Sequence, residues 1–381
     1  MKKTKVSPAR FMIGALMVFF AGAFILPAAL QSQDTRLYTL AAVIPAAILL
    51  GSSKRLTRLL LQDRVVFVMT LVLCGMSILV RTLADIEAGL SLAFLCAGAL
   101  ILMVAGSLFV RLLSLKAVFV LIPVVPALTL LVLPLIMNVS PFRPGFVSVV
   151  LLMTAFVSLL CFRKEFPAML MALAGSILLL AQRDLAAAAV WSVTFLLLFW
   201  AFSGHPLLLI AGAGATVLSA YLAGALLPGI YSPAGSSSFF TSVSPGWFGL
   251  ELSDPFLADA ATSDASAFSW IVVRYGWIFA GCVLMLCLLL VMRITSLARA
   301  SRYRMHGMLA MGAALLTGLS SVAALLSDFG IWPAPGFSLP ALTNDPVSVY
   351  AFLFLMGLAG GVSARSRADL DEDEHLAMLA D

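Results

Sequence analysis

The sequence predicts an all-α, polytopic membrane protein with about twelve transmembrane helices. Three observations predict this fold class: 62% of the residues are hydrophobic, only 11% are charged, and the mean hydropathy is +1.10. A helix needs about twenty consecutive apolar residues to cross a bilayer, and runs of this kind follow one another along the chain. Because every backbone polar group must be satisfied inside lipid, a bundle of helices is the expected architecture.

Each apolar run between two polar segments is interpreted as one helix. The runs are 11–30, 37–52, 65–83, 89–110, 117–137, 146–162, 166–182, 185–204, 206–228, 268–292, 305–326 and 346–363. We expect three parts: an N-terminal helix pair with a basic loop at 1–64, a transmembrane core at 65–363, and an acidic tail at 364–381. The tail is rich in Asp and Glu and is expected to lack regular structure.

The distribution of Lys and Arg predicts the orientation, because the cytoplasmic loops of membrane proteins carry an excess of both. With the N-terminus inside, eighteen of the 23 basic residues fall on the cytoplasmic side, and only Arg36, Arg143 and Arg183 fall outside. We therefore expect both termini in the cytoplasm. This bias also accounts for the net charge of +5, so nucleic acid is not an expected partner.

The cysteines and histidines indicate no metal or redox site. All five cysteines lie in apolar runs, none forms a C-x-x-C motif, and the three histidines are far apart. We expect the cysteines to be small packing residues. No cofactor is predicted, and the sequence leaves the need for a divalent cation open.

Two predicted outer loops are unusually long, which is typical of functional or disordered segments. The loop 229–267 contains aromatic and acidic residues but no Lys or Arg. The loop 327–347 is rich in Pro and Gly yet largely apolar. We expect the second loop to fold back into the mouth of the bundle as a re-entrant segment, where protein or a wet cavity covers its backbone.

Four charged residues lie in or next to apolar runs, where an ionisable side chain costs about 2.5–3.5 kcal/mol near the bilayer centre. Arg274 lies about two turns into a predicted helix, and Arg143, Arg183 and Asp184 adjoin outer helix ends. Guanidinium groups pair bidentately with phosphate oxygens, so these residues are candidates for binding a phosphate head group. The alternative is structural: Asp184 pairs with Arg183 or Arg274 and holds the bundle together.

Four segments of the chain match the motifs of one protein family. Residues 140–164 contain Phe142 and Pro144 of the motif F-Q-P-S-E-L-A-K, and residues 178–204 contain Gln182, Asp184, Leu185 and Ala187 of Q-P-D-L-G-T-A. Residues 262–281 are similar to T-D-F-I-F followed by E-E-F-G-x-I-G, and residues 328–358 to G-L-L-P-V-T-G-I-P-L-P-F-x-S-Y-G-G-S-S. With these motifs in this order, the chain resembles the SEDS proteins (FtsW, RodA and SpoVE) over about residues 64–363.

The resemblance implies a SEDS-like core of ten helices with two additional N-terminal helices, in a bacterial cytoplasmic (inner) membrane. It implies a glycosyltransferase that polymerises lipid II at the outer face, with a glycan on undecaprenyl pyrophosphate as donor. The loop aspartate of the family corresponds to Asp264, which would act as general base. A class B penicillin-binding transpeptidase would be the protein partner, and membrane lipid would surround the helices. Arg143 and Arg183 suit the pyrophosphate by their charge.

The sequence also departs from the family motifs. Phe146 and Val149 replace a Glu and a Lys, and Val273 and Arg274 replace a pair of Glu residues. Three functions therefore remain open. A divergent glycosyltransferase of cell division or cell-shape maintenance is favoured. The alternatives are a non-catalytic SEDS-like scaffold for a transpeptidase, and a flippase or transporter of a lipid-linked substrate.

Overall fold

The structure is a computed structural model of the 381-residue chain. It describes residues 63–84, 86–113, 121–137, 145–162, 165–204, 267–329 and 346–380, together with isolated positions between 210 and 342. The predicted runs at 11–30 and 37–52, and most of the run at 206–228, lie outside the described residues. The number of twelve helices therefore stays a prediction.

The described part of the chain forms nine helices. They are α3 (Arg64–Ala84), α4 (Ile86–Leu113), α5 (Leu121–Met137), α6 (Gly145–Cys161), α7 (Glu165–Ala181), α8 (Leu185–Ser203), α12 (Ala267–Ala300), α13 (Arg304–Asp328) and α14 (Pro346–Ala380). Each helix overlaps one predicted apolar run. Five are long and apolar enough to cross a membrane, and the others are shorter apolar helices. The prediction of an all-α, multi-pass membrane protein is confirmed.

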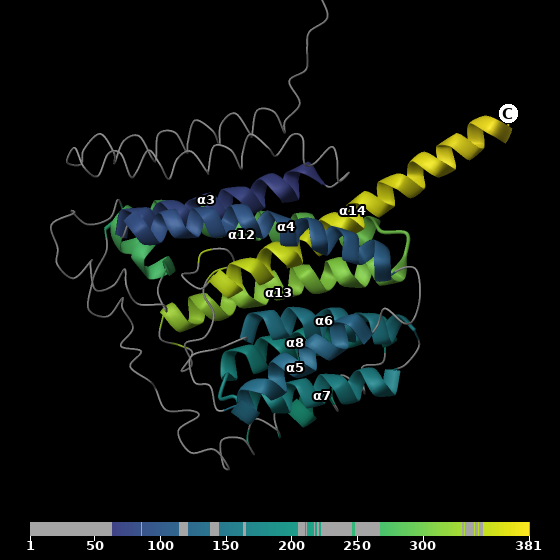
Figure 1. Cartoon of the computed structure of the whole chain (residues 1–381), viewed down its shortest axis with the longest axis horizontal. Coiled ribbons are helices and arrows are strands. Elements are labelled where there is room, and N and C mark those ends of the chain that lie inside the picture. Colours follow the sequence, from purple (N-terminus) through teal and green to yellow (C-terminus); the bar gives the residue numbers. More distant parts are fainter. Residues whose placement is uncertain are drawn as a thin grey trace, which may run out of the picture.

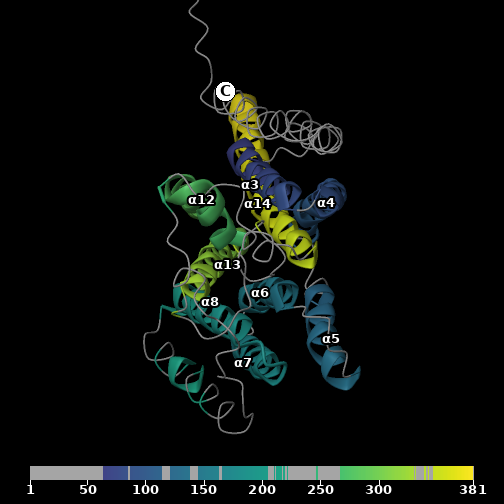
Figure 2. The same ribbon diagram turned by 90° about the vertical axis from the view of Figure 1, so that its left-hand side faces the viewer.

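The central helix of the described bundle is α13. It packs against α12, α8, α14 and α6. Figures 1 and 2 show α3, α4, α12 and α14 on one side of α13, and α5, α6, α7 and α8 on the other. Within the second group, the indole N–H of Trp191 on α8 donates to the carbonyl of Ala172 on α7 (3.0 Å). Helix α13 therefore contacts both groups, which also meet directly where α14 packs against α6.

Helices α4 and α14 approach each other closely because glycines lie at their contact. A side chain at Gly357 would collide with the carbonyl oxygen of Met103, and one at Gly361 would come within 2.8 Å of the carbonyl oxygen of Ser107. In lipid, where the hydrophobic effect does not drive helices together, small residues four positions apart permit this backbone contact. The spacing of Gly357 and Gly361 therefore fixes how α14 lies against α4.

Helix α12 is broken near its start. Gly276 has φ 83° and ψ 172°, a backbone conformation that is essentially restricted to glycine. The apolar span of this helix runs from Tyr275 to Ala300, so the first two turns form a separate segment before the span. In Figure 1 the ribbon of α12 changes direction at this end. An apolar run that contains a glycine does not reveal such a break in the sequence.

The acidic tail is helical, which corrects the expectation of an irregular end. Helix α14 continues to Ala380, although its apolar span ends at Ala364. Figure 1 shows this part of α14 projecting beyond the other helices. The segment 365–380 is rich in Ala, Leu, Glu and Arg, which are strong helix formers. The high charge of the segment favours disorder, but its helix propensity is sufficient to extend the helix that precedes it.

Two residues of the loop 327–347 are buried in the bundle. Leu339 and Leu342 belong to the apolar core, and the N–H of Leu342 donates to the carbonyl of Leu339 (2.8 Å) in a tight turn. This burial agrees with the expectation that the segment folds back into the bundle. The loop thereby returns to the end of the bundle at which α13 ends and α14 begins.

Candidate functional site

The sequence named five candidate site residues, and the structure describes the backbone of three of them. Arg183 and Asp184 lie between α7 and α8, and Arg274 lies in the first segment of α12. Asp264 and Arg143 lie outside the described residues. Their surroundings are therefore given by the elements that follow them directly in the chain: α12 begins three residues after Asp264, and α6 begins two residues after Arg143.

A tight turn places Arg183 and Asp184 at the start of α8. The N–H of Arg183 donates to the carbonyl of Leu180 (2.9 Å), and the N–H of Asp184 donates to that of Leu179 (3.1 Å). Arg183 has φ 61°, a left-handed conformation that costs about 1–3 kcal/mol for a residue other than glycine. The strain is offset by the next residue, because Asp184 becomes the N-cap of α8 and its Oδ1 accepts from the N–H of Ala187 (3.0 Å). The Arg183 side chain is exposed.

The structure brings Asp184 to the start of α6. A side chain at Gly145 would collide with Oδ2 of Asp184, so this carboxylate lies directly over the backbone of the first residue of α6. Arg143 precedes Gly145 by two positions. Asp184 and the first residue of α6 are therefore neighbours, although 38 residues lie between them in the sequence. This juxtaposition fits both interpretations of Asp184, as part of an anion site and as a structural partner.

The positions at which the SEDS resemblance implies Glu and Lys are packed with apolar side chains. Phe146 is 8% exposed, and Val149 is fully buried on α6. Both belong to the continuous apolar core of the bundle. These two positions on α6 therefore supply no charged group. The charged residues that the structure describes near the start of α6 include Arg183 and Asp184, between α7 and α8.

The long loop 229–267 returns to the break in α12. The N–H of Ile278, two residues after Gly276, donates to the carbonyl of Trp247 in this loop (3.4 Å). Directly after the break, the Trp277 ring stacks on Phe329 at the end of α13, with ring centroids 6.3 Å apart and an interplanar angle of 4°. The break is therefore held from two sides, by the loop and by α13.

A buried acid that the sequence does not predict lies near the break in α12. Asp328 is the last residue of α13 and is 9% exposed, and Ser269 lies in the first turn of α12 and is fully buried. The two residues come from helices that pack against each other, and the Ser269 hydroxyl forms no hydrogen bond with another described residue. The sequence assigned Asp328 to a loop because it follows the apolar run 305–326. The available signal was an acid directly after a long apolar run, where the last turn of the helix is still packed.

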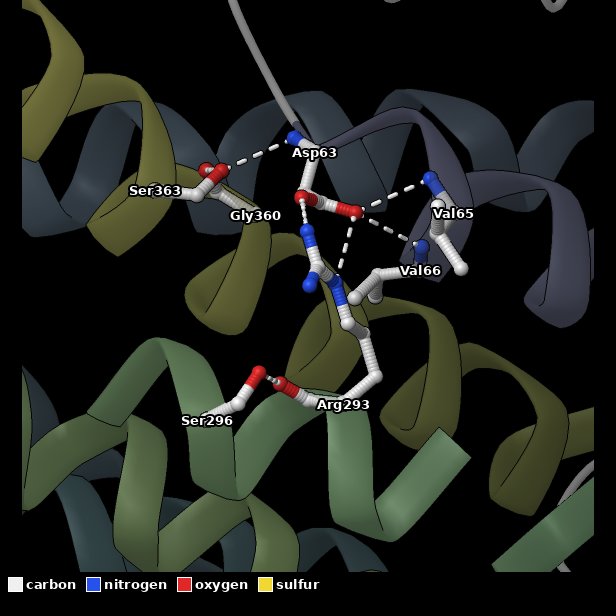
Figure 3. A network of polar contacts seen from close by, with 7 residues as sticks. All are labelled: Asp63, Val65, Val66, Arg293, Ser296, Gly360 and Ser363. Carbon is white, nitrogen blue, oxygen red and sulfur yellow. Dashed lines mark hydrogen bonds and ion pairs between the residues drawn. The ribbon is translucent and has the colours of Figure 1, made fainter. Parts of the chain in front are cut away.

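A second polar cluster lies where α3 begins, and the sequence gave no indication of it (Figure 3). Asp63 is 2% exposed, and its Oδ1 accepts from the N–H groups of Val65 (2.9 Å) and Val66 (3.2 Å). Its Oδ2 pairs with the guanidinium of Arg293 on α12 (2.6 Å). Its backbone N–H donates to Oγ of Ser363 on α14 (2.8 Å), and that hydroxyl donates to the carbonyl of Gly360 (2.8 Å).

This cluster acts as a structural tie. Burial by itself raises the pKa of Asp63, but the hydrogen bonds from Arg293 and from the N–H groups of Val66 and Val65, with the charge of Arg293, hold the pKa below its ordinary value of 3.8. The carboxylate is therefore ionised and fully engaged with α3 and α12. Both of its oxygens serve partners inside the protein, so it joins α3, α12 and α14 and is not a candidate for chemistry.

Within the described residues, no group of three or more His, Cys, Asp or Glu side chains is arranged to hold a metal ion. The prediction that no cofactor is needed stays a prediction. The polar side chains that the structure describes at the predicted outer end are of the kinds that bind anions and hydroxyl groups.

Comparison with solved structures shows which known proteins share the fold of this chain. No protein-family model and no curated protein sequence matches the chain. Among solved structures, a chain of a peptidoglycan synthase complex that coordinates polymerization and crosslinking is 20% identical, with a TM-score of 0.62, over 80% of this chain and 98% of that chain. The rod shape determining protein RodA of Thermus thermophilus is 19% identical, with a TM-score of 0.57, over 79% of this chain and 96% of that chain. A mutant of RodA with one Asp replaced by Ala gives 20% identity and the same TM-score. The chain has the fold of these proteins, and the fold implied by the SEDS resemblance is confirmed.

Proposed function

We propose that this multi-pass membrane protein, which shares its fold with RodA, is a divergent SEDS-type glycosyltransferase. It polymerises lipid II at the outer face of the bacterial cytoplasmic membrane, in cell division or cell-shape maintenance. The observation that carries the proposal is the shared fold, which extends over 96% of the RodA chain. Such completeness supports the proposal that the whole architecture is retained.

The proposed reaction is an inverting displacement. The 4-hydroxyl oxygen of the acceptor lipid II attacks the anomeric carbon of the donor glycan, and its proton passes to the carboxylate of Asp264 as general base. The bond from the anomeric carbon to the pyrophosphate oxygen breaks, and undecaprenyl pyrophosphate leaves with the electron pair. Because pyrophosphate is a good leaving group, the reaction needs no strong acid.

The place proposed for Asp264 rests on its position in the chain. Asp264 precedes Ala267, the first residue of α12, by three positions. The carbonyl of Trp247, in the same loop, accepts from the N–H of Ile278 on α12. The base would therefore work beside the first turns of α12, at the end of the bundle that the sequence predicts to be outside.

The proposed anion partners are Arg143, Arg183 and Arg274. The exposed side chain of Arg183 lies at the positive end of α8, where partial charges on the backbone favour an anion. Asp184 orders this rim, because it caps α8 and lies over the start of α6. The remaining two arginines adjoin the same end of α6 and of α12, and guanidinium pairs well with phosphate oxygens. The polyprenyl tail would stay in membrane lipid.

The experiment that tests the proposal uses the purified full-length protein in proteoliposomes with lipid II. Asp264→Asn and Asp264→Ala should reduce glycan-chain formation by about 100-fold or more, as expected for loss of a general base. Asp259→Asn, an acid of the same loop, is the matched control and should retain activity. The measurement is the length and amount of glycan on a gel. Chains of unchanged length and amount from Asp264→Ala would exclude this residue as the base.

A non-catalytic scaffold for a class B penicillin-binding transpeptidase is the second candidate. The observation that favours it is the apolar packing of Phe146 and Val149, where the resemblance implies charge. This candidate predicts that the protein co-purifies with the transpeptidase from a membrane extract while the wild-type protein forms no glycan from lipid II. Robust polymerisation by the purified protein would contradict it.

A further inference from the structure

Two arginines lie on either side of the turn between α12 and α13. Arg293 belongs to α12, and Arg304 is the first residue of α13. The distribution of Lys and Arg predicts that this turn is cytoplasmic, together with the start of α3 and the ends of α8 and α14. We call this the inner end of the bundle. Each arginine is bonded there to a different group of helices.

Arg293 joins α12 to the other helices of the first group, which consists of α3, α4, α12 and α14. Its Nη2 pairs with Oδ2 of Asp63 (2.6 Å), and its Nε donates to Oδ1 of the same carboxylate (3.5 Å; Figure 3). Two parallel hydrogen bonds fix the orientation of a guanidinium as well as its distance. The backbone N–H of Asp63 donates in turn to Oγ of Ser363 on α14 (2.8 Å). The inner part of α12 is thereby held to both α3 and α14.

Arg304 joins α13 to the second group, which consists of α5, α6, α7 and α8. Its Nη2 donates to the carbonyl of Phe202 in the last turn of α8, and its Cζ lies 4.1 Å from the centroid of the Phe202 ring. The last carbonyl groups of a helix have no partner within that helix, and a cation is favourable beside them. The contact with the face of the ring adds a cation–π attraction. Arg304 is therefore a C-terminal cap of α8 that comes from another helix.

The turn between the two arginines is compact. The N–H of Ser301 donates to the carbonyl of Ala298 (3.4 Å), and the Ser301 hydroxyl donates to the carbonyl of Tyr303 (3.2 Å). A side chain at Gly307 would come within 3.0 Å of the carbonyl oxygen of Ala298, so the end of α12 and the start of α13 are in close contact. A constraint on either helix is therefore passed to the other.

The opposite end of α12, which the sequence predicts to be outside, is built differently. Gly276 has φ 83° and ψ 172° and interrupts the helix. The segment before Gly276 can therefore change direction without bending the span from Tyr275 to Ala300. Helix α12 is thus bonded to its neighbours at the inner end and broken near the outer end.

We propose that Arg293, Arg304 and the turn between them form a clamp, which holds the two groups of helices together at the inner end so that the bundle opens only at its outer end. Alternating access in a transporter needs the reverse, because both ends must open in turn as one half moves against the other. The part of this inference that concerns lipid II rests on the proposed function. The closure of the inner end does not depend on it.

The test measures distances between pairs of spin labels in the full-length protein in lipid nanodiscs, with and without lipid II. Each pair joins α4 of the first group to α7 of the second, in a variant without the native cysteines. Leu108→Cys with Phe166→Cys reports on the inner end, and Phe94→Cys with Ile177→Cys reports on the outer end. All four side chains are exposed and belong to neither link of the clamp. The measurement needs no activity.

With the clamp intact, lipid II should increase the outer distance and leave the inner distance unchanged. Arg304→Ala should lengthen the inner distance in part of the molecules by about 5 Å, the scale of a one-turn displacement between packed helices. Arg299→Ala is the matched control, since it removes the same charge from an exposed arginine in the last turn of α12. It should leave the inner distance unchanged.

The other link is tested by Asp63→Asn combined with Arg293→Ala. The combination removes the ion pair without leaving a buried carboxylate unpaired, which would be strongly destabilising. It should lengthen the inner distance as Arg304→Ala does. Because Arg304 is exposed, Arg304→Ala leaves no buried charge unpaired and tests the clamp even if the combined variant does not fold.

Two results would overturn the inference: an inner distance that changes when lipid II is added to the protein with an intact clamp, or equal inner distances in Arg304→Ala and Arg299→Ala. An outer distance that does not respond to lipid II would instead contradict the proposed function. A longer inner distance in Arg304→Ala would still support the clamp in that case, so the two failures are distinguishable.

Discussion

At the scale of single residues, two carboxylates cap the helices that follow them. Asp63 accepts from two N–H groups in the first turn of α3, and Asp184 accepts from the N–H of Ala187 in the first turn of α8. Asp63 also pairs with Arg293 of α12. A cap of this second kind stabilises one helix and joins it to another.

The Asp63–Arg293 pair predicts a pH dependence of stability. Since the pKa of Asp63 is below its ordinary value of 3.8 in the folded protein, the stabilisation is fully present above the unfolded pKa and is lost as the pH falls through the folded pKa. Arg293→Ala leaves the buried carboxylate without its cation and should raise that pKa. We therefore expect the melting temperature to fall less between pH 7 and pH 3 in Arg293→Ala than in the wild type, because the gap between the folded and the unfolded pKa of Asp63 is smaller; the measurement is thermal denaturation in detergent.

The control for this experiment is the double variant Asp63→Asn with Arg293→Ala, which has no titrating group in the cluster. Its stability should change least with pH over the same interval. A parallel acid dependence in the wild type and in both variants would show that other groups determine it.

At the scale of elements, the sequence predicts where helices lie better than how they begin and end. The predicted run 305–326 corresponds to the helix Arg304–Asp328, and the run 185–204 to Leu185–Ser203. They agree because a helix that crosses a bilayer needs a certain length and an apolar composition. Nothing in the sequence distinguishes Gly276, which interrupts α12, from other glycines in apolar runs. Asp328 looked like a loop residue, and the pairing of Asp63 with Arg293 joins residues 230 positions apart. Contacts of this kind have no periodicity that a sequence could reveal.

The contact between α4 and α14 gives a prediction with a matched pair of glycines. A side chain at Gly357 would collide with the backbone of Met103, whereas Gly98 on α4 has open space around it. Gly357→Ala should lower the free energy of unfolding by about 1–3 kcal/mol through overpacking. Gly98→Ala should leave it unchanged or raise it by up to about 1 kcal/mol, because Ala favours the helix.

The measurement is the melting temperature of the purified protein in the same detergent for both variants. Equal melting temperatures for Gly357→Ala and Gly98→Ala would show that α4 and α14 can move apart to accommodate a methyl group without loss of stability. The close packing at Gly357 would then not contribute to stability.

At the scale of the whole molecule, hydropathy and the placement of charge predict most of the architecture. Nine predicted helices coincide with described ones, and the fold agrees with that of RodA. The candidate site was less accessible to prediction. Arg183 and Asp184 can be proposed from the sequence because ionisable residues next to apolar runs are rare, and their role stays a prediction. Ser269 gives no such signal, since serine is common in membrane helices.

The predicted orientation can be tested by labelling. In a variant without the native cysteines, Ser237→Cys in the loop 229–267 should react in intact cells with a maleimide that does not cross membranes. Ser301→Cys, between α12 and α13, should react only after the membrane is permeabilised. The charge bias of the loops gives this expectation. The reverse pattern would place the long loop in the cytoplasm and would exclude a reaction at the outer face.

The helical continuation of α14 has a consequence for the acids it carries. At 1.5 Å per residue, the acidic cluster at 369–374 begins about 8 Å and ends about 15 Å beyond Ala364, where the apolar span stops. The Debye length is about 8 Å at physiological ionic strength. Head groups extend about 5–7 Å beyond the hydrocarbon core. The helical continuation therefore holds these negative charges within about one Debye length of the head groups, where an anionic leaflet would repel them.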